Sequence, residues 1–414
     1  MANVLYLVHR LPYPPNKGDK VRSYHLLKHL ASLHRVHLGT FIDDPEDRTH
    51  VAVVEQMTAG LHVVDLHPAV AKLKSLQGLA RGEALSLPYY ADRSMRRWVE
   101  RVVRDEQIDA IVVFSSAMAQ YVQKQLEAAD GPVVLIDFVD VDSAKWAHYA
   151  ARHRWPLSWL YRRESRQLLA FERRVARVAD QSFFVTERES ALFCELAPEC
   201  AARVSTIGNG VDADYYAPNA ARPSPFTDEP VAPIVFTGAM DYWPNVDAVI
   251  WFAHEVLPLI RQTLPAVRFC IVGRNPPTAV QALASDHVSI TGTVPDVRPY
   301  LQHAGVVVAP LRVARGIQNK ILEAMAMERP VVASTACVDA FDAPTRATLA
   351  TATSAPDFAQ RVLAFYDAPQ QASHLGRQAR ASVLQRFSWA AHMVAIEAFM
   401  TRSLTEVQQA SHAA

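Results

Sequence analysis

Lys320 and Glu323 are the pair of residues in this chain whose types and spacing best suit chemistry. The sequence around them, residues 315–334, predicts a loop with a glycine, a short helix, and a buried strand that begins at Pro330. Residues three apart share one face of a helix, and the helix N-terminus offers unpaired N–H groups and partial positive charge to a diphosphate. Lys320 adds a mobile cation, and Glu323 can accept hydrogen bonds from sugar hydroxyls. These residues indicate a nucleotide sugar as ligand.

A plainer interpretation of the same segment stays open from the residues alone. The segment would then be an ordinary connection from a loop through a helix to a strand, and its Lys and Glu would be solvated. Its apolar residues would form a core-facing side of the helix. Those residues are Ile317, Ile321, Leu322 and Met325.

Composition narrows the class of protein. The chain has 414 residues, is 50% hydrophobic, and carries 42 basic and 42 acidic residues, so its formal net charge is zero. This length predicts two domains, each large enough to bury a core. A balanced charge argues against a nucleic-acid binder, which usually carries a basic excess. The four cysteines form no CxxC pair and no cluster with histidines, which indicates buried thiols in a reducing cytosol.

The sequence predicts a cytoplasmic protein, with peripheral contact to the inner face of the cytoplasmic membrane as a further expectation. The N-terminal residues, MANVLYLVHR, lack the basic and long apolar regions of a signal peptide and resemble a first β-strand. No apolar run approaches the roughly 18 residues that a membrane span needs.

Short apolar runs rich in Val and Ile alternate with longer amphipathic stretches along the chain. Continuous hydrophobicity is typical of parallel strands that helices cover on both faces. The first series of runs is 4–9, 36–41, 61–66, 110–114, 132–138 and 181–186, and the second is 233–238, 267–273, 288–293, 304–311 and 330–334. We therefore expect an α/β protein with two Rossmann-like, doubly wound domains that face each other across a cleft.

The two series of strands are separated by residues 213–232, which are rich in proline and have no apolar period. That composition indicates a linker. The expected organisation is an N-terminal domain over 1–212 and a C-terminal domain over 233–388. The long helical pattern from about 389 to 414 is expected to cross back to the first domain.

The loop from Pro12 to Lys20 follows the first expected strand and precedes an amphipathic helix. Gly18 would let the backbone approach a ligand closely, and the helix N-terminus would favour a phosphate. The loop contains neither a GxGxxG pattern nor a Walker pattern. From the residues alone, a ligand-binding loop and a solvated loop both remain open.

Asp137, Asp140 and Asp142 follow the apolar run 132–136, at the end of a strand where open α/β sheets bind ligands. Asp140 is the candidate for a contact to a sugar hydroxyl. One of these carboxylates could instead cap the next helix, a role for which Ser143 competes. The spacing of Asp140 and Asp142 would also suit a metal ion.

Residues 145–177 combine nine Lys or Arg with two acids, and Trp146, Trp155, Trp159 and Tyr161 are interleaved among them. A basic and aromatic surface suits the anionic face of a membrane. A pair of helices with its aromatic residues packed inward and its charges solvated would explain the pattern equally well.

Several motifs resemble the retaining GT-B glycosyltransferases of family GT4, the glycosyltransferases group 1 family. They are the block 315–334, Asn209-Gly210-Val211-Asp212, Phe236-Thr237-Gly238, Ile271-Val272-Gly273, and the segment 290–297. The resemblance extends over nearly the whole chain. Two further segments, 16–23 and 137–146, resemble the sugar transferases associated with the PEP-CTERM/EpsH exopolysaccharide system.

The resemblance implies a donor site in the second domain. Glu323 would hold the ribose hydroxyls, while Lys320 and the N–H groups from Gly316 to Asn319 would hold the diphosphate. Further donor-site candidates are Ile317, Arg312, Gly238 and Arg274. In the first domain the resemblance favours contact with the donor phosphate or the acceptor for Asn16, Lys17, Gly18, Asp19 and Lys20.

The chain departs from the family pattern at two places. Arg315 stands where the family usually has a second Glu that faces the donor hexose, so Arg315 is expected to add a phosphate-binding cation. The usual Arg and Lys after the first strand of the second domain are also missing, because Gly238 is followed by AMDYWPN. Neutralising the diphosphate would then depend on Lys320, Arg315 and Arg312.

The reaction that the resemblance implies transfers a hexosyl group from a nucleoside diphosphate sugar to a glycan or a polyprenyl-linked acceptor, with retention of anomeric configuration. GT-B sites neutralise the diphosphate with side chains and a helix end, so neither a metal nor a cofactor is expected. A nucleotide-sugar 2-epimerase of the same fold and a non-catalytic nucleotide-sugar-binding protein remain as alternatives. A NAD-dependent oxidoreductase is disfavoured, because no GxGxxG follows a strand.

Overall fold

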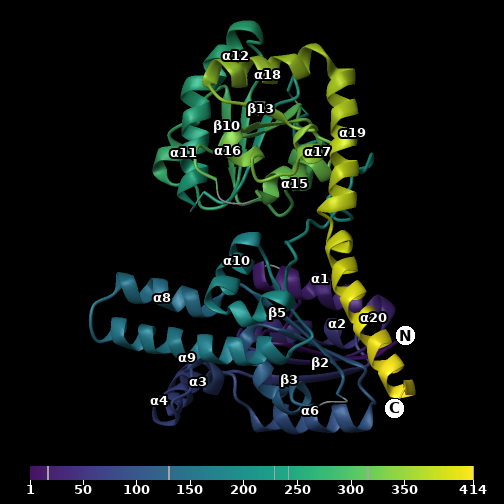
Figure 1. Cartoon of the computed structure of the whole chain (residues 1–414). Helices are drawn as coiled ribbons and strands as arrows, with labels where there is room; N and C mark the ends of the chain where they lie inside the picture. The colour runs from purple at the N-terminus through teal and green to yellow at the C-terminus, as the bar shows by residue number, and fades with distance from the viewer. Residues whose placement is uncertain (16–17, 129–130, 228, 241, 315–316, 414) are drawn as a thin grey trace. The chain divides into compact units, whose positions relative to one another are not determined.

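The structure is a computed structural model that describes residues 1–15, 18–128, 131–227, 229–240, 242–314 and 317–413. The chain forms two compact units (Figure 1). Unit 1 contains residues 1–209 and 392–414, and unit 2 contains residues 210–391. Among the described residues, no helix is long and apolar enough to cross a lipid bilayer.

Unit 1 is built on a seven-stranded sheet of order β3-β2-β1-β4-β5-β6-β7, in which every neighbouring pair is parallel. Its strands are β1 (Asn3–Val8), β2 (Arg35–Ile42), β3 (Gly60–Asp65), β4 (Ala110–Phe114), β5 (Val133–Val139), β6 (Gln181–Phe184) and β7 (Val204–Thr206). All five residues of β4 are buried. This uniform burial explains the continuous apolar runs, because helices cover both faces of the sheet.

The helices of unit 1 return the chain from one strand to the next. They are α1 (Gly18–Leu33), α2 (Val51–Glu55), α3 (Pro68–Ser75), α4 (Gln77–Arg81), α5 (Ser86–Tyr89), α6 (Arg93–Asp105), α7 (Gln123–Leu126), α8 (Asp142–Arg152), α9 (Leu157–Val178) and α10 (Glu187–Leu196). Three 3₁₀ turns lie at Pro45–His50, Ser116–Tyr121 and Pro198–Arg203. Helices α8 and α9 lie side by side and extend away from the sheet as a hairpin (Figure 1).

Unit 2 has a six-stranded sheet of order β10-β9-β8-β11-β12-β13, again with parallel neighbours. Its strands are β8 (Ile234–Thr237), β9 (Phe269–Val272), β10 (Val288–Gly292), β11 (Val306–Ala309), β12 (Val331–Ser334) and β13 (Ala350–Ala352). Its helices are α11 (Trp243–Trp251), α12 (Leu257–Thr263), α13 (Thr278–Gln281), α14 (Arg298–Gln302), α15 (Asn319–Ala326), α16 (Thr335–Val338), α17 (Ala343–Arg346), α18 (Ala355–Asp367) and α19 (Pro369–Arg386). A π-helical turn at Phe252–Val256 joins α11 to α12. The expected α/β fold with two parallel, doubly wound sheets is confirmed.

Two strands and one segment differ from the sequence expectations. Strands β7 and β13 escape prediction because each has three residues, few of them apolar, at the end of its sheet. Residues 213–232 pack against the core of unit 2 through Tyr216, Phe226 and Val231, so much of the expected linker is part of that unit. The helix α20 (Trp389–Ala413) begins in unit 2 and continues into unit 1.

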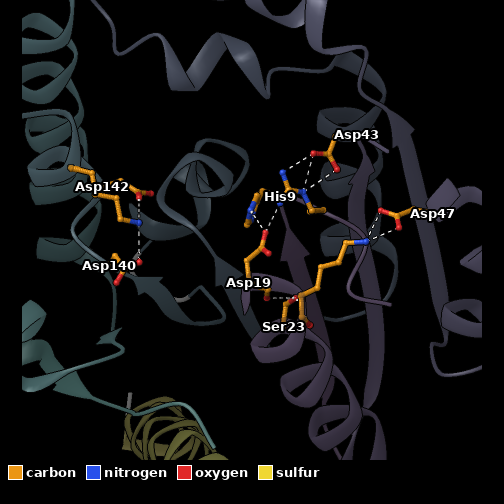
Figure 2. A network of polar contacts seen from close by, with 10 residues as sticks. His9, Asp19, Ser23, Asp43, Asp47, Asp140 and Asp142 are labelled. Atoms are coloured by element: carbon orange, nitrogen blue, oxygen red, sulfur yellow. Dashed lines mark hydrogen bonds and ion pairs between the residues drawn. The ribbon is translucent and has the colours of Figure 1, made fainter. Parts of the chain in front are cut away.

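Two buried ion pairs fasten α1 to unit 1. The Arg22 guanidinium contacts both carboxylate oxygens of Asp137 on β5, at 2.7 and 3.2 Å, and donates to the Ile207 carbonyl at 2.8 Å. Two residues earlier on α1, Lys20 Nζ lies 2.6 Å from both carboxylate oxygens of Asp47 (Figure 2). Lys20 and Arg22 are each 1% exposed. These pairs hold α1 in place and explain why a helix with charged residues in its first turn is buried there.

Replacing Lys20 tests whether its role is structural. Lys20→Met is expected to lower the free energy of unfolding by about 3–5 kcal/mol, because it leaves the buried Asp47 carboxylate unpaired. Lys20→Met/Asp47→Leu should recover most of that loss. Urea denaturation followed by circular dichroism measures both changes. Lys28→Met, at an exposed position of the same helix, is the control, and equal stability of Lys20→Met and Lys28→Met would contradict the assignment.

Candidate functional site

The strand order of unit 2 marks one place for a ligand. Strands β8 and β11 are neighbours, but the chain continues from β8 to β9 on one side and from β11 to β12 on the other. Open α/β sheets bind ligands at the carboxyl ends of strands where the order reverses in this way. Gly238 directly follows β8, and α15 with Lys320 and Glu323 follows β11. The topology therefore brings three of the predicted donor-site residues to the same edge of the sheet.

The ammonium group of Lys320 sits in a narrow space between two side chains of unit 2. Its Nζ donates to Asn245 Oδ1 at 2.5 Å and lies 4.0 Å from the centroid of the Phe236 ring. Burial lowers the pKa of Lys320 to about 7, although the nearby Glu323 favours the charged form. The charge of the amine therefore changes with pH near neutrality, and an anion bound beside it would favour the protonated form.

Gly238 is required for this arrangement. A Cβ atom at Gly238 would lie 2.8 Å from Lys320 Nζ and 2.8 Å from Asn245 Nδ2, closer than side chains tolerate. Asn245 is itself buried on α11, where its amide donates to the Ala239 carbonyl at 2.8 Å. Asn245 was not among the residues predicted from the sequence, where the segment after Gly238 differs from the family pattern by the cations that it lacks. The sequence signal that could have identified Asn245 is a polar residue in the first turn of the helix that follows the first strand of unit 2.

Glu323 lies one turn after Lys320, where Tyr216 is its hydrogen-bond partner. Burial raises the pKa of Glu323, although Lys320 and the Tyr216 hydroxyl both favour its charged form. Tyr216 was not predicted as a site residue, because it lies in the expected linker. Arg380 on α19 fixes that segment by donating to the Ala213 and Tyr216 carbonyls, both at 3.3 Å. A carboxylate held in this way can receive hydroxyl donors of a ligand.

The two ends of α15 differ in their partners. At the N-terminus, the N-cap residue Gln318 makes no side-chain cap hydrogen bond, and the positive end of the helix dipole there favours an anion. At the C-terminus, the Arg380 guanidinium donates to the Ala326 carbonyl. A cation there complements the negative end of the helix dipole. The polarity of α15 thus matches the predicted binding of a diphosphate beside Lys320.

The other predicted donor-site residues have varied environments. Ile317 is 39% exposed, and Asn319 is exposed as the first residue of α15. Arg274 is exposed directly after β9, and its carbonyl accepts a hydrogen bond from the Met240 amide at 2.9 Å. Arg315, where the chain departs from the family pattern, and Gly316, a candidate for the diphosphate contact, lie outside the described residues.

Arg312 already has a carboxylate partner. Its guanidinium contacts both oxygens of Asp247 on α11, with Nε 2.9 Å from Oδ2. Arg312 also lines a hollow of about 480 Å³ at the carboxyl ends of β11, β12 and β13, and neither Lys320 nor Glu323 lines that hollow. Because Asp247 balances its charge, Arg312 is a weaker candidate for neutralising a diphosphate than Lys320.

Unit 1 has its own reversal of strand order, between β1 and β4, and a polar network lies beside it (Figure 2). Arg10 bridges Asp43 at 2.6 Å and Asp19 at 2.7 Å, and His9 Nε2 lies 3.5 Å from Asp19. The His9 ring stacks on Phe114 at the end of β4, with centroids 5.8 Å apart. Burial alone would raise the pKa of Asp19, but His9 and Arg10 hold that pKa well below its usual range.

This network changes the interpretation of the early loop. Asp19 is an ionised carboxylate in the first turn of α1, which begins at Gly18, so it suits hydroxyl groups better than phosphate oxygens. Lys20 was predicted to contact a phosphate or the acceptor, but its ammonium is buried against Asp47 instead. Asn16 and Lys17 lie outside the described residues.

Asp140 lies at the carboxyl end of β5, as its spacing predicts. Lys145 Nζ contacts Asp140 at 2.8 Å and Asp142 at 3.0 Å, so one ammonium neutralises both carboxylates (Figure 2). Helix α8 begins at Asp142 without a side-chain cap from the preceding residue. Within the described ranges, no three His, Cys, Asp or Glu side chains lie together as metal ligands. A contact of Asp140 to a sugar hydroxyl stays a prediction.

Comparisons with known proteins identify the fold and the family of unit 2. Residues 232–368 match the family described as glycosyl transferases group 1. A search of curated proteins returns no match. Among solved structures, HepE of Anabaena, in complex with UDP, is similar with a TM-score of 0.62 and 16% identity over 97% of this chain and 100% of that one.

Two further structures have the same architecture. The sucrose-phosphate synthase of Thermosynechococcus elongatus gives a TM-score of 0.59 and 16% identity over 100% of both chains. An enzyme described as a UDP-N-acetylglucosamine 2-epimerase, from Listeria monocytogenes, gives 0.55 and 12% identity over 98% of this chain and 97% of that one. At these identities the likeness shows the fold. Residues 232–368 are thus a glycosyl transferases group 1 domain, and the protein is a glycosyltransferase with the GT-B fold.

Proposed function

We propose that the protein is a retaining glycosyltransferase of bacterial exopolysaccharide biosynthesis. It moves a hexosyl group from a nucleoside diphosphate sugar to a glycan or a polyprenyl-linked acceptor. The observation that carries the proposal is the pairing of Lys320 and Glu323 at the strand-order reversal of unit 2. The exopolysaccharide role is supported by the resemblance of residues 16–23 and 137–146 to the sugar transferases of the PEP-CTERM/EpsH system.

The donor diphosphate is proposed to bind between the Lys320 ammonium and the N-terminus of α15. Both groups are positive where the ligand is negative, and both are positioned before the ligand arrives. Glu323 would then accept hydrogen bonds from the ribose hydroxyls one turn further along the helix. Solved structures of the similar HepE contain UDP, UDP with glucose, and UDP-glucose, which makes UDP-sugars the first donors to test.

In the proposed mechanism, the protein mainly stabilises the leaving group. Cleavage of the glycosidic bond increases the negative charge on the diphosphate, so Lys320 and the N–H groups of α15 stabilise the transition state more than the bound donor. The acceptor hydroxyl attacks on the face that the diphosphate leaves, and a phosphate oxygen takes its proton. This route retains the anomeric configuration and uses no protein nucleophile.

The proposal includes peripheral contact with the membrane through the α8–α9 hairpin, which carries most of the basic and aromatic segment 145–177. Trp155, between the two helices, is 81% exposed, and Trp159 is 53% exposed. Trp146 and Tyr161 instead pack against each other, with ring centroids 5.3 Å apart. Trp146 and Tyr161 therefore pack between the helices, whereas Trp155 and Trp159 are exposed at the end of the hairpin. These two exposed residues would enter the interface of an anionic membrane.

Incubation with UDP-, GDP- and ADP-sugars tests the reaction class. A thermal-shift series identifies the donor, since a ligand that binds the folded state raises its apparent stability. A transferase without acceptor slowly releases free hexose and nucleoside diphosphate. A 2-epimerase would yield the epimeric sugar, and a binding protein would yield no product, so either result would refute the proposal.

The partial burial of Lys320 predicts a pH dependence of nucleotide binding. Free Lys320 has a pKa of about 7, and a bound diphosphate raises that pKa, so binding takes up a proton. The affinity for UDP is therefore highest below pH 7, where free Lys320 is already protonated. It decreases as the pH rises through 7, by at most about tenfold per pH unit. Isothermal titration with UDP between pH 7 and 9 measures this, because the phosphate itself titrates near pH ~6.

Two variants provide the controls for that titration. Lys320→Arg keeps a charged group over the whole range and should give a flat profile. Lys320→Met should bind UDP weakly at every pH. A wild-type affinity that does not change between pH 7 and 9 would refute the role of Lys320.

Replacing Glu323 tests the proposed ribose contact. Glu323→Gln should weaken UDP binding by about 1.5–3 kcal/mol, the range for hydrogen bonds to a charged group, and should lower donor hydrolysis in parallel. Tyr216→Phe should have a smaller effect, since it removes only the group that orients the carboxylate. Asp286→Asn removes the same charge at an exposed position of unit 2 and should change neither quantity. Unchanged binding in Glu323→Gln would refute the assignment.

A further inference from the structure

Unit 1 contains a cationic hollow that the proposed reaction does not yet use. Its volume is about 690 Å³, within the range of roughly 300–1,000 Å³ that is usual for small-molecule sites. Its walls come from α3, α4, α5, α6, α7, α9 and the segments between them. Five cations line the hollow, namely Lys74, Arg81, Arg93, Arg96 and Arg174.

The positive charge of this hollow exceeds the negative charge of its wall, because five cations face two acids, Glu83 and Asp92. In the described part of the chain, none of the five cations forms an ion pair with a carboxylate within 4.0 Å. Of the two acids in the wall, Asp92 is already used as the N-cap of α6, accepting from the amides of Ser94 and Met95 at 2.7 and 3.0 Å. Glu83 is the second acid. Unpaired cations gathered around a concave space favour an anionic ligand.

The hollow lies at the ligand-binding edge of the sheet of unit 1. The N-terminus of α6 and the turn Ser116–Tyr121, which follows β4, both contribute to its wall. The Tyr121 hydroxyl joins these two parts, because it accepts from the Asp92 amide and donates to the Tyr90 carbonyl. Tyr90 packs edge-on against His9 with centroids 5.8 Å apart. The segment around Tyr90 therefore connects the hollow with the polar network at the strand-order reversal.

Apolar side chains are exposed on the two helices that carry Lys74 and Arg81 and at the residue between these helices. Leu73 is 71% exposed, and Val70, Leu76 and Leu79 are between 38% and 51% exposed. Helices α3 and α4 lie on the side of unit 1 where α9 also passes (Figure 1). Four exposed aliphatic residues over ten positions of a short helical segment leave apolar surface without a partner. A ligand with an anionic head and a hydrocarbon tail would match both features.

We propose that the hollow binds the diphosphate of a prenyl-linked acceptor, whose hydrocarbon chain lies along α3 and α4. This inference rests on the proposed function for the nature of the acceptor. The guanidinium groups of Arg93 and Arg96, on successive turns of α6, bind the phosphate oxygens together with Arg81 and Arg174. The hollow would thus anchor the acceptor in unit 1, while Lys320 and Glu323 hold the donor in unit 2.

The test measures diphosphate binding with the donor site disabled. The background protein is Lys320→Met, and the probes are farnesyl diphosphate and inorganic diphosphate, titrated by calorimetry. Arg93→Ala/Arg96→Ala removes two cations of the hollow. Arg97→Ala/Arg101→Ala is the matched control, because it removes two cations from exposed positions of the same helix outside the hollow. Thermal unfolding verifies folding, and removing crowded cations should not lower stability.

Farnesyl diphosphate should bind the background protein and bind Arg93→Ala/Arg96→Ala at least about tenfold more weakly, while the control pair changes affinity by less than about twofold. Leu73→Ser/Leu76→Ser should lower the affinity for farnesyl diphosphate but leave the affinity for inorganic diphosphate unchanged. Equal losses in the test and control pairs would overturn the proposal, because they would indicate general charge attraction. Binding to phosphatidylglycerol vesicles that falls in Arg93→Ala/Arg96→Ala, without preference for farnesyl over inorganic diphosphate, would overturn it too.

Failure of this inference can be told apart from failure of the proposed function. Donor hydrolysis depends on unit 2 and is measured with Lys320 intact. If hydrolysis persists in Arg93→Ala/Arg96→Ala while farnesyl diphosphate does not bind the hollow, the inference alone is refuted. If the hollow binds farnesyl diphosphate but no donor is hydrolysed, the proposed transferase activity is refuted.

Discussion

Parallel strands that are covered on both faces require each connection to return through a helix, and this constraint decides where each unit can hold a ligand. Every strand ends at the same edge of its sheet, followed by the start of a helix or turn. Where the strand order reverses, two such connections diverge and leave room beside exposed helix ends. In unit 2 this places Gly238 and Lys320 together, and in unit 1 it places His9 beside Phe114.

Burial does different things to the cations of this protein. Lys20 and Arg22 are buried with carboxylate partners, and they fasten a helix to its sheet. Lys320 is confined beside a neutral amide and an aromatic ring, so its pKa falls toward neutrality and its charge is sensitive to a ligand. The cations of the hollow lie at the surface without carboxylate partners, which leaves their charge available to an anion. The partner, rather than the residue type, distinguishes these three roles.

The donor-side candidates are connected to the framework of unit 2 through residues distant in sequence. Tyr216 reaches Glu323 from the segment that follows β7, and Arg380 on α19 fixes both that segment and the end of α15. Asn245 reaches Lys320 from α11. Three parts of the chain, separated by up to about 165 positions, thus orient two side chains on one short helix.

The sequence by itself determined the two parallel sheets and the helix that carries Lys320 and Glu323, because continuous apolar runs and spacing along a helix are local properties. It also predicted Asp140 at the end of β5. The tertiary structure alone decided that Lys20 is buried against Asp47, that Lys145 joins Asp140 and Asp142, and that Tyr216 is a hydrogen-bond partner of Glu323. It alone gathered the cations of α3, α4, α6 and α9 around one hollow. Those outcomes depend on contacts between charged side chains that form only when the chain folds. The spacing of residues along the chain does not specify these contacts.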